Sequence, residues 1–244
     1  MRLGLLRCDE LSHNLVSVHG GYLDLFSKLF SRVDPSIELA EYNVVAGELP
    51  RDPAEQDAWL VSGSNASTYD DEPWIASLLD LLRDLDAARA TTVGLCFGHQ
   101  ALAQALGGKV CRSDEGWGVG VQPAVLIGAE GWIPSSYLQF AIVYCHQDVV
   151  TILPDGARLI ASAKHCPIAA FASGNHILGI QGHPEFSTNL AADLYAEMAL
   201  TLGEETMVVA QNTLNDGTDR VDTARWILRF ISSRKEIKEA AKLV

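Results

Sequence analysis

Short apolar segments alternate with helical patterns through the first hundred residues, and this alternation narrows the choice of folds more than any other feature. Four of the segments have the length of buried strands: residues 2–7, 37–42, 58–63 and 91–96. Between the last two, residues 74–88 place Ile75, Leu78 and Leu82 at helical spacing, with charged residues at other positions. Strands that alternate with helices in this way predict a parallel sheet covered by helices.

The second part of the chain has a different pattern. From Lys109 to about Phe171, short apolar runs are separated by Gly, Pro and Asp, which predicts a small antiparallel or mixed insertion. Then come a buried strand and two helices, at residues 176–182, 189–202 and 222–242. Because no internal repeat or linker interrupts these patterns, we predict one α/β domain over residues 1–244, with a mostly parallel central sheet.

Charge and cysteine content argue against several classes of protein. The chain carries 18 Lys and Arg against 31 Asp and Glu, for a net charge of −13, and has no run of basic residues. We therefore expect neither a nucleic acid nor a membrane as partner. The first residues lack the apolar stretch of a secretory signal, and no segment stays apolar over the roughly 18 to 20 residues that cross a bilayer. Five cysteines, an odd number, fit reduced thiols, so we expect a cytoplasmic protein.

The sequence TTVGLCFGHQ, which begins at Thr91, runs from a buried strand directly into a helix. Gly94 and Gly98 flank Cys96 in the G-x-C-x-G form of a nucleophile elbow, a sharp turn that holds its side chain out at the end of the strand. The positive end of the following helix stabilises a thiolate, the reactive form of cysteine. A free cysteine is more often a small buried apolar residue, but this flanking pattern favours a nucleophile at Cys96.

A second short sequence, GIQGHPEF, supplies a base and a carboxylate. Residues two apart in extended backbone point to the same side, so His183 and Glu185 can lie together at the end of a buried strand. A carboxylate beside an imidazole fixes its tautomer and stabilises the imidazolium, as in acyl-transfer triads. Taken alone, this tripeptide is more typical of a surface turn. Together with the elbow, it predicts a Cys-His-Glu site.

The two sequences GLCFGHQALAQALGG and GIQGHPEF together resemble the class I glutamine amidotransferase family. The resemblance extends to residues 59–64 and 144–150 and implies a three-layer, flavodoxin-like fold. It also implies Cys96 as nucleophile, His183 as base and acid, and Glu185 as the carboxylate that orients His183. It further implies that backbone N–H groups near Gly63 and Ser64, together with that of Phe97, form an oxyanion hole. Gln100 is implied to contact the glutamine moiety of the substrate. The position of Phe97, just after a nucleophile at a helix N-terminus, independently supports its role.

Two departures from the family pattern bear on the activity. Where many members have S-G-G-P, this chain has the longer segment at residues 62–74, which is more similar to stand-alone members, the γ-glutamyl peptidases and GMP-synthase-like proteins. No phosphate-binding G-x-x-x-x-G-K-[ST] loop is present for an ATP-using step. We expect hydrolysis of a γ-glutamyl amide, either glutamine or a γ-glutamyl conjugate, through a thioester on Cys96, without metal or organic cofactor.

Other interpretations stay open at this point. The chain could supply ammonia to a separate synthetase, or could be a non-catalytic binding or regulatory protein on the same fold. A related family of cysteine-elbow proteins lacks the His-Pro-Glu segment. A zinc cluster is disfavoured because the two Cys and His pairs near residues 145 and 165 lack metal-ligand spacing. His146 and Asp148 border the site only by resemblance, and residues 114–117 lie either near the substrate or in a turn.

Overall fold

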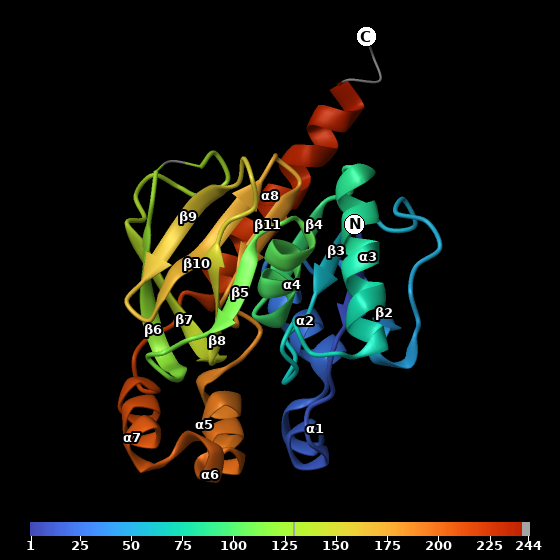
Figure 1. Ribbon diagram of the computed structural model, residues 1–244. Helices are drawn as coiled ribbons and strands as arrows, with labels where there is room; N and C mark the ends of the chain where they lie inside the picture. The colour runs from blue at the N-terminus through green and yellow to red at the C-terminus, as the bar shows by residue number, and fades with distance from the viewer. Residues whose placement is uncertain (129, 241–244) are drawn as a thin grey trace.

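The computed structural model describes residues 1–128 and 130–240, and a nine-stranded sheet lies at its centre (Figure 1). The strands follow one another across this sheet in the order β2 (Glu38–Asn43), β1 (Arg2–Arg7), β3 (Ala58–Val61), β4 (Thr92–Leu95), β11 (Ile177–Ile180), β10 (Cys166–Ser173), β9 (Arg158–Ala163), β6 (Gly118–Leu126) and β7 (Gln139–His146). From β2 to β11 every neighbouring pair is parallel. This parallel part contains the four strands predicted in the first hundred residues.

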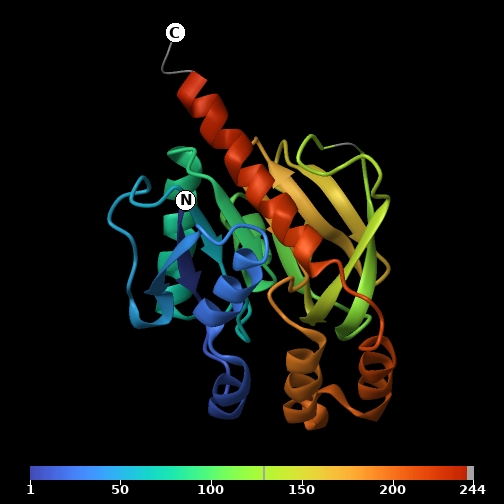
Figure 2. The same ribbon diagram turned by 180° about the vertical axis from the view of Figure 1, so that it is seen from behind.

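Helices cover both faces of the parallel strands, as the alternating pattern predicts. The helices α3 (Pro73–Ala87) and α4 (Phe97–Ala105) lie on one face, and α2 (Tyr22–Ser31) and α8 (Arg220–Ala240) lie on the other (Figures 1 and 2). Within β3, Trp59 and Val61 join the apolar cluster of α3 and α4, whereas Leu60 joins that of α2 and α8. Because successive side chains of a strand point to opposite faces, this arrangement gives the predicted three layers.

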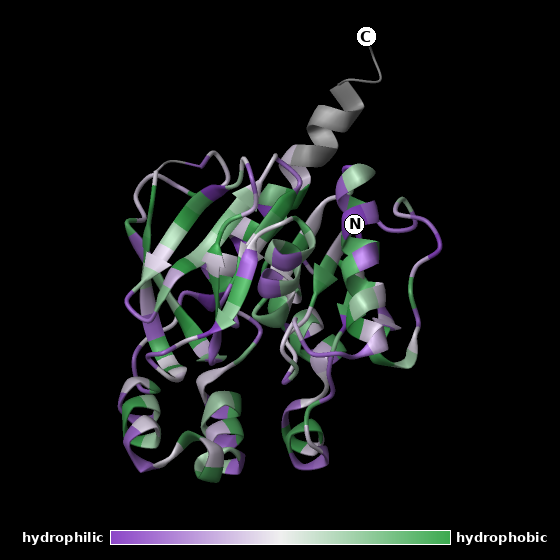
Figure 3. Cartoon of the chain, in the orientation of Figure 1, coloured by the Kyte–Doolittle hydropathy of each residue, from purple (hydrophilic) through white to green (hydrophobic). Residues whose placement is uncertain are grey.

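The predicted insertion does not stand apart from the parallel sheet. Its strands β10, β9, β6 and β7 pair antiparallel and continue the same sheet beyond β11. A two-stranded sheet of β5 (Lys109–Arg112) and β8 (Asp148–Ile152) lies beside them. Hydrophobic residues concentrate along the central strands, whereas helices such as α3 carry both kinds of residue (Figure 3).

The region after Phe186 contains more helices than the two predicted. It contains α5 (Thr188–Glu197), α6 (Ala199–Leu202), α7 (Glu204–Thr213) and α8. The helix α7 was not predicted because it has little amphipathic pattern: Ala210 is its buried residue, and Val208 and Val209 are about half exposed. The last predicted helical residues, 241–242, lie outside the described part of the chain. Among the described residues, no helix combines the length and apolar character needed to cross a bilayer.

The carboxyl ends of the parallel strands position the site. Neighbouring β1, β3, β4 and β11 all end at one edge of the sheet, where α1 (His13–His19), α5 and α6 project downward in Figure 1. Loops that follow strands far apart in sequence therefore meet at this edge. Among them are the elbow after β4, the loop after β3 and the His-Pro-Glu segment after β11.

Candidate active site

Cys96 lies between β4 and α4 with φ of 52° and ψ of −106°, a left-handed conformation that is strained for a residue with a side chain. The flanking glycines permit this turn because no side chain would fit in their place. A Cβ at Gly94 would lie 2.2 Å from the carbonyl oxygen of Gly98, and a Cβ at Gly98 would lie 2.4 Å from that of Val61. The close approach of strand, turn and helix accounts for the spacing of the G-x-C-x-G sequence.

We therefore predict that Gly98→Ala lowers the free energy of unfolding by about 3 kcal/mol or more, because the new methyl group must displace the backbone of β3. Urea denaturation measures the change. Gly217→Ala is a matched control, since a Cβ there meets nothing within 4 Å, and it should change stability by less than about 1 kcal/mol. Equal stability of the two variants would contradict the steric account of the elbow.

His183 and Glu185 form a buried pair after β11. The imidazole donates from Nδ1 to Glu185 Oε1 at 2.7 Å, and the two side chains are 4% and 0% exposed. Phe186 stacks on the His183 ring, with centroids 4.1 Å apart and planes 4° from parallel. The backbone N–H of His183 donates to Val143 O at 2.7 Å, which anchors the segment to β7. These contacts fix the orientation of the ring and leave Nε2 free to face Cys96.

The surroundings of His183 favour its charged form. Burial lowers its pKa, but the charges of the neighbouring Cys96 and Glu185, together with the hydrogen bond to Glu185, raise it more. The net effect is a pKa above the ordinary value of 6.5. An imidazolium is therefore the favoured state beside Cys96, and it can support negative charge on the sulfur.

The amides expected to form an oxyanion hole are close to this pair. A Cβ placed on Gly63 would lie 2.9 Å from His183 Cε1 and 3.7 Å from Cys96 Cβ. The N–H of Gly98 donates to Ser62 O at 3.1 Å, which ties the elbow to the loop after β3. Among the described residues, the backbone N–H groups of Gly63, Ser64 and Phe97 have no hydrogen-bond acceptor. Three donors near one sulfur are thus available to an anionic oxygen.

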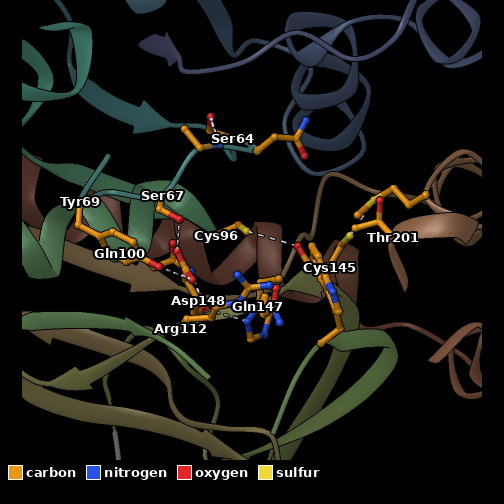
Figure 4. A pocket seen from close by; sticks show the side chains of 15 residues that line it. Ser64, Ser67, Tyr69, Cys96, Gln100, Arg112, Cys145, Gln147, Asp148 and Thr201 are labelled. Carbon is orange, nitrogen blue, oxygen red and sulfur yellow. Dashed lines mark hydrogen bonds between the residues drawn. The ribbon is translucent and has the colours of Figure 1, made fainter. Parts of the chain in front are cut away.

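A cavity of about 420 Å³ opens in front of Cys96 (Figure 4). Its wall includes Cys96 and Cys145, Ser64 from the loop after β3, Gln147 from the turn between β7 and β8, and Thr201 from α6. The thiol of Cys96 lies 3.8 Å from Cys145 O, and the Gln181 amide donates to it from Nε2 at 3.7 Å. A second cavity of about 40 Å³ touches Cys96 on the side of His183 and Phe186. Cys96 thus lies between a large cavity and a small one beside His183.

The loop after β3 is tied to β8 by two side chains that the sequence does not identify. Ser67 Oγ donates to Asp148 Oδ2 at 2.6 Å, and Tyr69 OH donates to Asp148 Oδ1 at 2.9 Å (Figure 4). We call these two hydrogen bonds the Asp148 latch. The partners are 81 and 79 residues apart in sequence, and no local pattern signals the pairing. Gln181, inside the G-I-Q-G segment, is a further contact of Cys96 that the sequence patterns do not identify.

The other predicted contacts divide into two groups. Gln100 lines the large cavity, and its Nε2 donates to Asp148 O at 2.8 Å and to Gln181 Oε1 at 3.2 Å. His146, Asp148 and Trp117 also lie in the wall of the cavity. Asp114 and Glu115 are instead exposed in a turn. For these two residues, the turn is therefore the correct one of the two placements that the sequence left open.

The remaining cysteines differ from Cys96 in their surroundings. Burial raises the pKa of Cys8 and Cys145 well above the usual range and that of Cys166 to about 12, so these thiols are neutral at ordinary pH. Among the described residues, no three His, Cys, Asp or Glu side chains come together as a metal site would require.

Comparison with known proteins identifies the family of the chain. The family model for glutamine amidotransferase class-I matches residues 25–200. The chain is 33% identical over 201 residues to gamma-glutamyl peptidase 5 of Arabidopsis thaliana and 31% identical over 201 residues to gamma-glutamyl peptidase 3 of the same plant, with 79% of each chain covered in both cases. A crystal structure of a glutamine amidotransferase from Thermotoga maritima has a TM-score of 0.75 at 18% identity, covering 96% of this chain and 97% of that chain, and so shares the fold. The chain therefore belongs to the class I glutamine amidotransferase family, and it is an enzyme of the kind that hydrolyses C–N amide bonds.

Proposed function

We propose that this enzyme hydrolyses a γ-glutamyl amide through a γ-glutamyl thioester on Cys96. The observation that carries the proposal is the position of Cys96 at a strained elbow, beside the buried His183–Glu185 pair and three unbonded amides. Nucleophile, base, orienting carboxylate and oxyanion donors are the parts that acyl transfer needs. The family of the chain and its similarity to proteins named gamma-glutamyl peptidases support the choice of substrate.

In this mechanism the sulfur of Cys96 attacks the γ-carbonyl carbon, and the carbonyl oxygen becomes an oxyanion held by N–H groups of Gly63, Ser64 and Phe97. The imidazolium of His183 gives its Nε2 proton to the leaving nitrogen, the C–N bond breaks, and the amine departs. Neutral His183 then removes a proton from water, which attacks the thioester. The C–S bond breaks, glutamate is released, and His183 is again protonated. Glu185 holds the ring in one tautomer throughout.

The Asp148 latch supports hydrolysis by the isolated chain. An enzyme that waits for a partner needs a site that is incomplete until docking, whereas here Ser67 and Tyr69 already hold the oxyanion loop against β8. The cavity of about 420 Å³ is within the range of drug-sized ligand pockets. It therefore offers room for a leaving group larger than ammonia, and a γ-glutamyl conjugate is the substrate we favour over glutamine.

The test is kcat/KM of the purified chain, without ATP, for glutamine, glutathione, γ-glutamyl-aminobutyrate and a γ-glutamyl-polyamine. We expect turnover of at least one γ-glutamyl conjugate in isolation. Negligible turnover of every compound, followed by strong glutaminase activity when a synthetase is added, would replace this proposal with that of an ammonia-supplying subunit. Inactivity under both conditions would favour a binding or regulatory protein.

The latch gives a further prediction. The double variant Ser67→Ala, Tyr69→Phe should lower kcat/KM by about tenfold, because loss of two hydrogen bonds to one carboxylate frees the loop that carries Ser64. The matched control is the double variant Ser77→Ala, Tyr42→Phe. It also removes one serine hydroxyl and one tyrosine hydroxyl, but from α3 and β2, away from the cavity. Steady-state kinetics would contradict the role of the latch if both double variants kept full activity.

A further inference from the structure

A third cavity, of about 260 Å³, lies next to Glu185 and shares no lining residue with the large cavity in front of Cys96. It is lined by residues of α1, α2 and α8 and by the segment that leads from β11 into α5: Val18, His19, Leu25, Lys28, Arg32, Glu185, Ser187 and Arg220. The helices α2 and α8 that form it lie side by side on the face seen in Figure 2. We call it the basic cavity.

Positive charge gathers in the basic cavity of a chain that is strongly acidic overall. Lys28, Arg32 and Arg220 line it, although the chain has only 18 Lys and Arg and a net charge of −13. Its one lining carboxylate, that of Glu185, is hydrogen-bonded to His183. The cavity therefore carries a net charge of about +2, opposite in sign to the chain as a whole.

Two of the three cations, Arg220 and Lys28, are held in place by hydrogen bonds, and neither is neutralised by its partners. Arg220 donates from Nε to Pro184 O at 3.0 Å and from its guanidinium to Glu185 O at 2.9 Å, and Lys28 Nζ donates to His19 O at 2.7 Å. All three acceptors are uncharged carbonyl oxygens. Among the described residues, the side chain of Arg32 has neither a hydrogen-bond nor an ion-pair partner.

The positive charges of Arg32 and Arg220 in the basic cavity repel one another. Burial lowers the pKa of Arg220, the Glu185 carboxylate raises it, and the neighbouring Arg32 lowers it again. Ser187, whose hydroxyl accepts from Leu190 N at 3.2 Å, caps the ten-residue helix α5 at this cavity and brings the positive end of its dipole there. A bound anion would relieve the repulsion between Arg220 and Arg32 and would meet two cations, Arg220 and Lys28, that hydrogen bonds already orient.

We propose that the basic cavity binds a small compound carrying a phosphate group, at a site separate from the substrate cavity. A dianion matches the net charge of about +2, and tetrahedral phosphate oxygens suit several cationic donors that approach from different helices. The volume of about 260 Å³ greatly exceeds the roughly 30 Å³ of one water molecule and leaves room for a substituent on the phosphate. Because Glu185 and the Arg220 contacts form part of the wall, the ligand lies directly against the segment that holds His183.

Isothermal titration calorimetry at low salt tests this proposal with three probes: inorganic phosphate, glycerol 3-phosphate and succinate. The protein is the full chain with Cys96→Ala, so that binding is read without turnover and independently of the proposed hydrolysis. We expect one phosphate group bound per chain, weaker binding at higher salt, and weaker binding still of succinate. Tighter binding of glycerol 3-phosphate than of inorganic phosphate would identify a phosphate ester as the ligand, and the reverse order would identify the free ion.

Variants locate the site. Arg32→Ala should weaken phosphate binding by about tenfold or more, as should Lys28→Ala, whereas Arg32→Lys should retain most of it. Arg112→Ala is the matched control, because Arg112 is an exposed arginine that lines the substrate cavity instead. The proposal is overturned if no phosphate compound binds, if succinate binds as tightly as phosphate, or if Arg112→Ala weakens binding while Arg32→Ala does not.

Discussion

Replacing Cys96 with alanine should lower kcat/KM for the γ-glutamyl substrate by about 10³-fold or more while the protein remains folded. In the proposed mechanism the sulfur of Cys96 forms the thioester, and burial keeps the other thiol of the cavity, that of Cys145, neutral. The elbow should survive because alanine has the Cβ of cysteine and nothing beyond it that the turn requires. Circular dichroism and the midpoint of urea unfolding measure the fold, and steady-state hydrolysis measures the activity.

Covalent labelling makes the same experiment specific for one sulfur. A chloroketone analogue of glutamine should add its mass to the unmodified chain and to Cys145→Ser, but not to Cys96→Ala. Cys145 is a demanding control because it lines the same cavity, while burial raises its pKa and keeps its thiol neutral. Labelling that persists in Cys96→Ala, or that maps to Cys145 by peptide mass spectrometry, would show that the nucleophile is misassigned.

The parts of the fold that the sequence predicts are those encoded over short stretches. The parallel strands and α3 follow from apolar runs and helical spacing, and both faces of β3 are buried because helices cover both faces of the sheet. The pairing of β10 with β11, which joins the antiparallel strands to the parallel ones, is a tertiary choice that no local pattern encodes. The helix α7 escaped prediction because it buries little apolar surface.

The site divides in the same way. Cys96 with its glycines and His183 with Glu185 are each contained in a few consecutive residues, so chemistry and spacing identify them together. The Asp148 latch depends on contacts between a loop and a strand far apart in sequence. The basic cavity likewise requires α2 and α8, from opposite ends of the chain, to pack side by side before its cations meet. Motifs thus predict the reacting groups, whereas the tertiary structure adds the side chains that hold them in place and the cavity behind them.

The second large effect is expected at His183. His183→Ala should lower kcat/KM by about 10³-fold or more, since it removes the group that we propose as both the proton donor for the leaving amine and the base for water. Glu185→Gln should also lower kcat/KM, but by a factor about ten to a hundred times smaller than that of His183→Ala. The amide oxygen can still accept from Nδ1, whereas the charge that stabilises the imidazolium is lost. Near-normal turnover of a folded His183→Ala would refute the proposed Cys-His-Glu mechanism whatever Glu185→Gln did.

The pH dependence of kcat/KM separates the charge of Glu185 from its hydrogen bond. Cys96 and Glu185 raise the pKa of His183 above 6.5, so the imidazolium, our proposed proton donor for the leaving amine, persists above pH 6.5 and is lost only at more alkaline pH. Glu185→Gln removes one of these two causes, and the alkaline fall in kcat/KM should therefore move to lower pH. Glu197→Gln, on the exposed end of α5, is the charge-matched control and should leave the profile in place. An unchanged alkaline limb in Glu185→Gln would mean that Glu185 only positions the ring, because its charge would then contribute nothing to holding the proton on His183.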